Sequence, residues 1–296
     1  MNILTHLRKI GRLLRETLKQ WQQDKASRLA AALAYYTVFS ISPLLVIAIA
    51  IAGVFFGQSE AKQQVVEQLG GLIGSEAMQP ILNALDNISQ PQVRGAASLI
   101  SIGVLFIGAS GIFAQLQDAL NTVWRVQPNS GQGIGHFIRK RVFSFIMVVA
   151  IGFLLILSLL LSAVVSTISK YRTDFLPGSA ILWENLDFII SLGLMTFLFG
   201  LMFKYVPDAI ITWKDVWVGS VITALLFLFG KFLLGLYLSK GSLGSPYGAA
   251  GSLIVFLAWV YYSAQIILLG AEFTQVYAQM YGSKIRASKG SKITQS

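Results

Sequence analysis

Long apolar runs recur along the whole chain, separated by shorter polar segments. A helix needs roughly 20 residues to cross about 30 Å of hydrocarbon, and each run is close to that length or longer. The runs are Leu29–Phe56, Gly95–Ala114, Val142–Ile168, Phe188–Tyr205, Val216–Leu238 and Gly251–Tyr277. We predict an all-α, polytopic membrane protein whose membrane domain, residues 29–277, is a bundle of six transmembrane helices.

The segments that flank this domain are basic. Residues 1–28 carry apolar side chains at helical spacing, with Arg and Lys distributed between them: Leu7, Ile10, Leu14, Leu18 and Trp21. This pattern predicts an amphipathic helix lying on the membrane surface, either as an anchor or as a regulatory or partner-binding element. For residues 278–296 we predict a disordered cytoplasmic tail.

Between the first two predicted spans, residues 58–90 form the longest outer loop. Apolar residues recur on one face of two short predicted helices, which a glycine-rich stretch at 70–74 separates. These helices either cap the bundle on its outer side or lie in the outer leaflet with their apolar faces down.

The composition supports a membrane protein, because only 12% of the residues are charged, against roughly 25% in a soluble domain. Of the 23 Lys and Arg residues, 17 fall on the side of the predicted bundle where both termini lie. The positive-inside rule therefore predicts cytoplasmic termini. The net charge of +10 is explained by attraction to anionic inner-leaflet lipid, so no nucleic-acid partner is needed.

Polar residues inside the predicted spans are the candidates for a functional site. Tyr261, Gln265 and Glu272 share one stripe of the last span, because four and seven residues separate them. Glu272 lies near the cytoplasmic end of its helix, where the macrodipole disfavours an anion, so we expect a cationic or hydrogen-bonding partner. The carboxyl either locks two helices together or belongs to a transport pathway.

The second span is polar at the same level, since Gln115, Asp118 and Asn121 lie at its cytoplasmic end. We expect these amides and carboxylates to converge with Glu272 on a wet recess at the inner mouth of the bundle. Such a recess would serve a transport pathway.

Three further candidates come from the first span. Tyr36 and Ser40 are one turn apart, and Pro43 removes a backbone hydrogen bond, which predicts a kink. The kink is either purely structural or part of the pathway.

The fifth span contains one more candidate, Lys231, a cation well within a span, where it either snorkels to the outer interface or faces the bundle interior.

Several chemistries are absent from the sequence. No G-x-x-x-x-G-K-[ST] stretch occurs, which excludes ATP-driven transport within this chain. There is no cysteine, and the two histidines, His6 and His136, are far apart, so a zinc site is not expected. No G-x-S-x-G nucleophile elbow is present. We therefore expect neither an enzyme nor a bound cofactor or metal.

Four stretches resemble the YihY/BrkB family of bacterial inner-membrane proteins, once labelled ribonuclease BN. They are AAALAYYTVFSISPLL (30–45), LQDALNTVW (116–124), YVPDAIITWKDVWVGS (205–220) and SPYGAAGSLIVFLAWVYYSAQIILLGAEF (245–273). The resemblance implies a six-helix bundle in the bacterial cytoplasmic membrane. Family members are mostly described as transporters, and lipid or lipopolysaccharide translocation is suggested for some. The ribonuclease label conflicts with the histidine inventory.

Two functions remain open at this point. The first is a transporter or permease, not driven by ATP, for an unidentified solute or a lipid-linked anion. The alternative is a non-transporting membrane scaffold whose polar residues join helices and whose basic segments bind lipid or another protein. In either case membrane lipid is the expected partner, and the oligomeric state is open.

Overall fold

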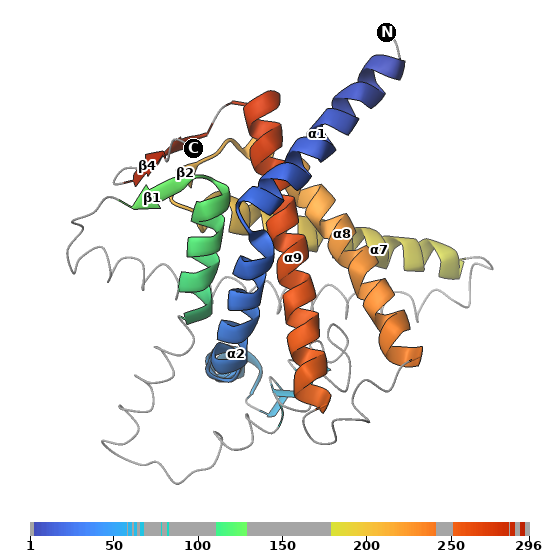
Figure 1. Ribbon diagram of the computed structural model, residues 1–296. Coiled ribbons are helices and arrows are strands. Elements are labelled where there is room, and N and C mark those ends of the chain that lie inside the picture. Colours follow the sequence, from blue (N-terminus) through green and yellow to red (C-terminus); the bar gives the residue numbers. More distant parts are fainter. Residues whose placement is uncertain are drawn as a thin grey trace.

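The computed structural model describes residues 3–57, 111–128, 179–240, 251–283, 285–287 and 291–293, together with eight positions between 59 and 82 (Figure 1). The predicted span Val142–Ile168 lies outside these residues, as does most of Gly95–Ala114. The described part is mostly helical, as predicted.

Five long helices form the framework. They are α1 (Ile3–Gln23), α2 (Ala26–Phe56), α7 (Ser179–Tyr205), α8 (Trp213–Lys240) and α9 (Gly251–Met280). A further helical segment covers residues 111–123. Among the described residues, α8 and α9 contain apolar stretches long enough to cross a membrane, 213–233 and 253–280, and α7 has a shorter one, Ile189–Tyr205.

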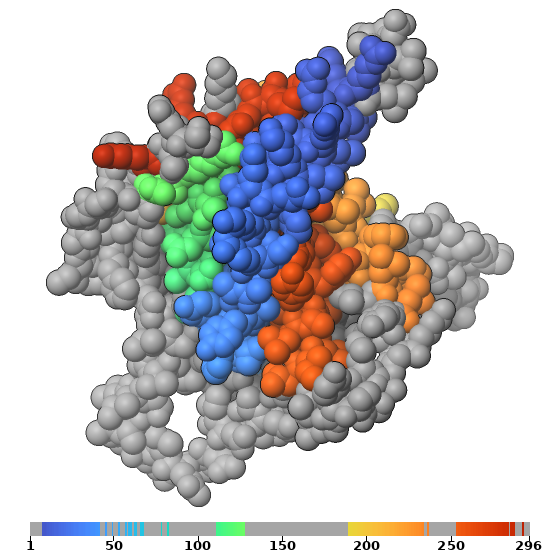
Figure 2. All heavy atoms as spheres, viewed as in Figure 1, coloured from blue at the N-terminus to red at the C-terminus, as the bar shows by residue number. Residues whose placement is uncertain are grey.

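Helix α9 lies at the centre of the described part. It packs against α8, α2 and α1, while α7 packs against α8. Figure 2 shows α1 and α2 lying over α9, with residues 111–128 beside α2. The largest core cluster joins α2, residues 111–126, α7, α8 and α9 through side chains such as Ala30, Leu120, Phe203, Val216 and Leu268.

Helices α8 and α9 touch through two reciprocal Gly–Thr contacts. A Cβ on Gly219 of α8 would overlap Thr274 of α9, and a Cβ on Gly270 of α9 would overlap Thr223 of α8. Each threonine hydroxyl donates to the carbonyl of the glycine one turn earlier in its own helix, Thr223 to Gly219 at 2.7 Å and Thr274 to Gly270 at 2.6 Å. Small residues thus let the two backbones approach, as is typical of membrane helices.

The connections between helices correct the all-α prediction. Strand β1 (Val126–Pro128) pairs antiparallel with β4 (Ser291–Ile293), and β2 (Ala209–Ile210) pairs antiparallel with β3 (Arg286–Ala287). The prediction of a disordered tail is therefore wrong for residues 285–287 and 291–293. Arg125, with φ of 53°, ends the helical segment before β1. In the β1–β4 and β2–β3 pairs, each extended segment supplies hydrogen-bond partners for the backbone groups of the other.

The outer loop contacts the bundle at three described positions. Val66, Met78 and Leu82 pack against a cluster formed by residues of α2 and α9, among them Leu45 and Phe256. The rest of the loop lies largely outside the described residues, so its two predicted arrangements stay open.

Candidate functional site: a polar pocket beside a buried carboxyl pair

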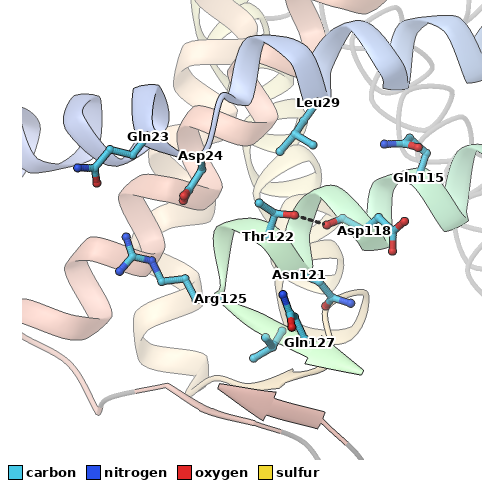
Figure 3. A pocket seen from close by; sticks show the side chains of 10 residues that line it. Gln23, Asp24, Leu29, Gln115, Asp118, Asn121, Thr122, Arg125 and Gln127 are labelled. Carbon is cyan, nitrogen blue, oxygen red and sulfur yellow. Dashed lines mark hydrogen bonds between the residues drawn. The ribbon is translucent and has the colours of Figure 1, made fainter. Parts of the chain in front are cut away.

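A pocket of about 670 Å³ opens where α1 turns into α2. Its wall comes from two parts of the chain: Gln23, Asp24 and Leu29 from the α1–α2 region, and Gln115, Asp118, Asn121, Thr122, Arg125, Val126 and Gln127 from the segment that ends in β1. Figure 3 shows Gln115 and Asp118 at one side of the pocket, with Asp24 and Arg125 at the other. The lining is mostly amide and carboxylate, which suits a polar ligand.

Asp208, in the bend between α7 and β2, holds the pocket-lining helix in place. Its carboxylate accepts hydrogen bonds from Asn121 Nδ2 at 2.9 Å and from Gln117 Nε2 at 3.1 Å. Its backbone N–H donates to Asn121 Oδ1 at 2.8 Å. Asn121 is buried, and Asp208 is the hydrogen-bond partner of both the oxygen and the nitrogen of its side-chain amide. This pairing determines which face of the helical segment 111–123 lines the pocket.

Arg125 joins the same segment to α1. Its left-handed backbone, with φ of 53°, ends the helix and turns the chain into β1. The guanidinium Nη2 donates to Gln20 Oε1 on α1. In Figure 3 the Arg125 side chain extends toward Asp24, which places the one cation of the pocket lining near its buried wall.

Behind that wall lies Glu272 of α9, which has no exposed surface. Its carboxyl group faces that of Asp24, near enough for a hydrogen bond, and Arg125 is close enough for a favourable Coulomb interaction. Neither Glu272 oxygen, nor Asp24 Oδ2, accepts a hydrogen bond from a described residue. Two ionised carboxylates cannot bond to each other, because neither carries a donor.

Asp24 lies outside the membrane-crossing helices, in the turn between α1 and α2. Burial raises the pKa of its carboxyl group, while the Arg125 charge and the contact with Glu272 lower it in part. The net change in the pKa is upward, because desolvation is the largest cause. Asp24 therefore binds a proton more readily than an exposed aspartate does.

The structure brings together only some of the ten candidates from the sequence. Gln115, Asp118 and Asn121 line the pocket, and Glu272 lies behind it, next to Asp24. Gln265 is half-buried on the same helix as Glu272, and its Oε1 has no hydrogen-bond partner among the described residues.

The other five candidates are not part of the pocket lining. Tyr36 and Tyr261 are exposed, and Lys231 is half-buried. Ser40 is buried against Gly111, whose added Cβ would lie 3.3 Å from Ser40 Oγ. Helix α2 continues through Pro43 to Phe56, so the proline does not end the helix.

Sequence reasoning missed Asp24, Arg125 and Asp208. Asp24 is one of two acids in the basic segment 1–28, and Arg125 enters the sequence argument only through its charge. Asp208 lies in the matched stretch YVPDAIITWKDVWVGS, where the proline before it signals the end of a helix. Their roles depend on contacts between distant segments: Asn121 and Asp208 are 87 residues apart, and Asp24 and Glu272 are 248 residues apart. Among the described residues, no three His, Cys, Asp or Glu side chains form a metal site.

The fold and the pocket define a helical membrane protein with a polar recess at one end of its bundle. The chain belongs to the family described as Virulence factor BrkB, whose model matches residues 17–293. The family resemblance expected from the four sequence stretches is thereby confirmed.

Individual relatives agree with this assignment. The chain is 24% identical over 272 residues to a UPF0761 membrane protein of Acinetobacter baylyi, an alignment that covers 91% of this chain and 62% of the relative. It is 28% identical over 267 residues to a UPF0761 membrane protein of Verminephrobacter eiseniae, covering 88% and 60%. For the Pseudomonas aeruginosa relative the identity is 28% over 257 residues, covering 84% and 58%.

The chain spans about three fifths of the length of the curated relatives it matches. No solved structure matches the chain. These comparisons identify a membrane protein and its family, and they assign no activity to it.

Proposed function

We propose that the protein is a permease of the bacterial inner membrane that moves a polar solute without ATP. The observation that carries this proposal is the polar pocket of about 670 Å³, whose wall separates it from a fully buried carboxyl on a membrane-length helix. A buried carboxylate within a membrane helix is costly, and such residues are typical of ion and substrate pathways.

In this proposal the bundle has six spans and the pocket opens to the cytoplasm. The aromatic side chains at the α7–α8 connection support a membrane–water interface at this end: Tyr205, Trp213 and Trp217 are grouped there, with Lys204 Nζ 5.9 Å from the Trp213 ring centre. Asp208, in the same connection, binds the pocket-lining helix. Figure 1 also shows both chain ends toward this end of the bundle, in keeping with an even number of spans.

The charges of the pocket favour a neutral or cationic solute. Asp24 and Asp118 contribute two carboxylates, whereas Arg125 contributes one guanidinium that already donates to Gln20. An anionic, lipid-linked cargo would draw its support from the basic face of α1 and not from this pocket. The two versions of the proposal therefore predict different cargo in the same assay.

The test is solute flux in proteoliposomes. We expect wild-type protein to admit sorbitol or putrescine faster than empty liposomes do, with glycerol 3-phosphate excluded, and we expect Asp118→Leu to reduce the flux at least several-fold. Glu16→Gln, on α1 and outside the pocket lining, is the matched control and should leave the flux unchanged, because glutamine keeps an oxygen that can accept from Gln20. Exchange of fluorescent phosphatidylglycerol between leaflets, without solute flux, would replace the solute version with the lipid version.

The scaffold remains the alternative from another class. Its support is the closely packed α8–α9 contact and the extensive core that joins five parts of the chain. If folded wild-type protein moved none of the solutes and exchanged no lipid, the permease proposal would fail and the scaffold would stand.

A further inference from the structure

Asp24 and Glu272 come from opposite ends of the described chain and meet at the base of the pocket. Asp24 is half-buried and lines the pocket, so this residue is the member of the pair that borders the open space. Glu272 has no exposed surface and lies one side chain further in. The two carboxyl groups thus form a step from solvent to the interior of the bundle.

The hydrogen-bond acceptors of this pair lack donors. Both oxygens of Glu272 and Oδ2 of Asp24 are buried, and no described residue donates to them. Leaving a buried acceptor without a partner costs roughly 1–3 kcal/mol, and more if the group is charged. A hydrogen atom held on one carboxyl would donate to the other and satisfy both groups at once.

The surrounding charges leave the pair with a negative excess. Arg125, from the turn before β1, is the cation that interacts with both carboxyl groups, and its Nη2 also donates to Gln20. At the start of α2, Lys25 and Arg28 are exposed. Helix α1 contributes Lys19 and Glu16, which pair with each other at 3.6 Å. The α8 carboxylate, Asp215, accepts hydrogen bonds from Ser283, three residues after the end of α9.

We propose that Asp24 and Glu272 together bind one proton at the base of the pocket, and that this proton is the coupling ion of the permease. The second half of this proposal rests on the proposed function. One guanidinium balances one carboxylate, and a shared proton neutralises the other, as in other pairs of facing carboxyl groups. A metal ion fits less well, because the described residues offer no third carboxylate or imidazole here.

The arrangement gives each carboxyl a distinct role. A hydronium ion in the pocket gives its proton to the Asp24 carboxylate, which breaks one O–H bond, forms another and leaves a water molecule. Transfer to Glu272 then breaks the Asp24 O–H bond and forms one on the Glu272 carboxylate. Asp24 connects the pair to solvent on the pocket side, and Glu272 holds the proton at the edge of the membrane-crossing part of α9. Solute in the pocket would lie against the same Asp24 carboxyl group, which links occupancy of the pocket to protonation of the pair.

The test is infrared spectroscopy of the purified, full-length protein in nanodiscs, with no solute added. We expect wild type at neutral pH to show the C=O stretching band of a protonated carboxylic acid, shifted in deuterated buffer. The band should disappear in Asp24→Asn and in Glu272→Gln, because each variant supplies an amide donor and leaves a single carboxylate. Glu16→Gln should retain it.

Absence of the band from wild type, or its persistence in either variant, would overturn the shared proton. Should Glu272→Gln not fold, Asp24→Asn and the wild-type spectrum still decide, since Asp24 lies outside the membrane-crossing helices. The measurement is also independent of transport. If the band is present but no solute flux is found, the permease proposal fails and the shared proton stands. If flux is found but the band is absent, the shared proton fails and the permease proposal stands.

Discussion

At the scale of single residues, the chemistry concentrates where Asp24, Arg125 and Glu272 meet. Three segments supply them: the α1–α2 turn, the turn before β1 and the C-terminal part of α9. Their charges do not balance by pairing alone, because one guanidinium faces two carboxyl groups. This imbalance makes protonation the variable that sets both the stability of the site and its response to pH.

Replacing Asp24 by asparagine tests this dependence on pH. Burial raises the pKa of Asp24, so its stabilising contribution is complete below the ordinary value of 3.8 and is lost as the pH rises through the raised value. Asparagine cannot ionise and supplies an N–H donor to Glu272. We expect Asp24→Asn to unfold in detergent at the same or a higher temperature than wild type at neutral pH, with a flatter dependence of Tm on pH. A steeper dependence would contradict this.

A second prediction at this scale concerns Asn121 and Asp208. Asn121→Ala removes two hydrogen bonds from the Asp208 carboxylate and backbone and leaves part of that residue unsatisfied. We expect a loss of roughly 1–3 kcal/mol in unfolding free energy. Thr122→Ala, at the neighbouring exposed position, should change stability far less. In a double-mutant cycle, additive effects of Asn121→Ala and Asp208→Ala would show that the hydrogen bond between the two side chains contributes nothing.

The sequence alone could predict which residues in this region are unusual, but not which of them meet. Glu272 stands out because a carboxylate in an apolar helix needs a partner, and the polar spacing of Gln115, Asp118 and Asn121 marks the neighbouring segment. The partner itself, Asp24, could not be inferred, because it depends on how the α1–α2 turn packs against α9. The sequence led to the expectation of a cationic or hydrogen-bonding partner, and the structure supplies Arg125 together with a second acid.

At the scale of elements, the contact between α8 and α9 is the most sensitive to change. Gly219→Ala places a methyl group where Thr274 packs, so the helices must separate or the threonine must shift. We expect a clear fall in Tm and a partial recovery in the double variant Gly219→Ala/Thr274→Gly. Gly193→Ala on α7, where an added Cβ meets nothing within 4 Å, is the matched control. Equal effects of the two alanine substitutions would refute the close contact.

Helix α1 divides its apolar residues between protein and solvent. Leu13 is buried in a cluster with Phe273 and Val276 of α9, whereas Ile10, Leu14 and Leu18 are 50–54% exposed. The basic side chains Arg8, Lys9, Arg12, Arg15 and Lys19 are exposed on a different face. This division suits a helix whose exposed leucines enter the headgroup region while its basic face attracts anionic lipid.

The absence of cysteine from the chain makes this arrangement testable with single-cysteine variants. In nanodiscs that contain phosphatidylglycerol, we expect Leu14→Cys to react slowly with a water-soluble maleimide and Arg12→Cys to react quickly. The difference in labelling rate should be smaller in nanodiscs of uncharged lipid, where the basic face of α1 is attracted to the membrane less strongly. Equal labelling of both positions in anionic nanodiscs would show that α1 does not lie on the membrane.

At the scale of the whole molecule, the pattern of apolar runs predicts most of the described architecture. The long helices α2, α7, α8 and α9 fall on predicted spans, because each apolar run is long enough to form one. The β1–β4 and β2–β3 pairs could not be predicted, since strands of two or three residues carry almost no periodic signal and their pairing joins the tail to segments up to 167 residues away, from Val126 to Ile293.

The central claim is that the pocket and the carboxyl pair behind it form the cytoplasmic half of a proton-coupled solute pathway. The most direct measurement is uptake, under an imposed pH gradient, of whichever of sorbitol and putrescine enters wild-type proteoliposomes faster. We predict accumulation that follows the gradient in wild type and collapses with an uncoupler, and equilibration without accumulation in Glu272→Gln. Accumulation by Glu272→Gln equal to that of wild type, or no uptake by wild type at all, would contradict the claim.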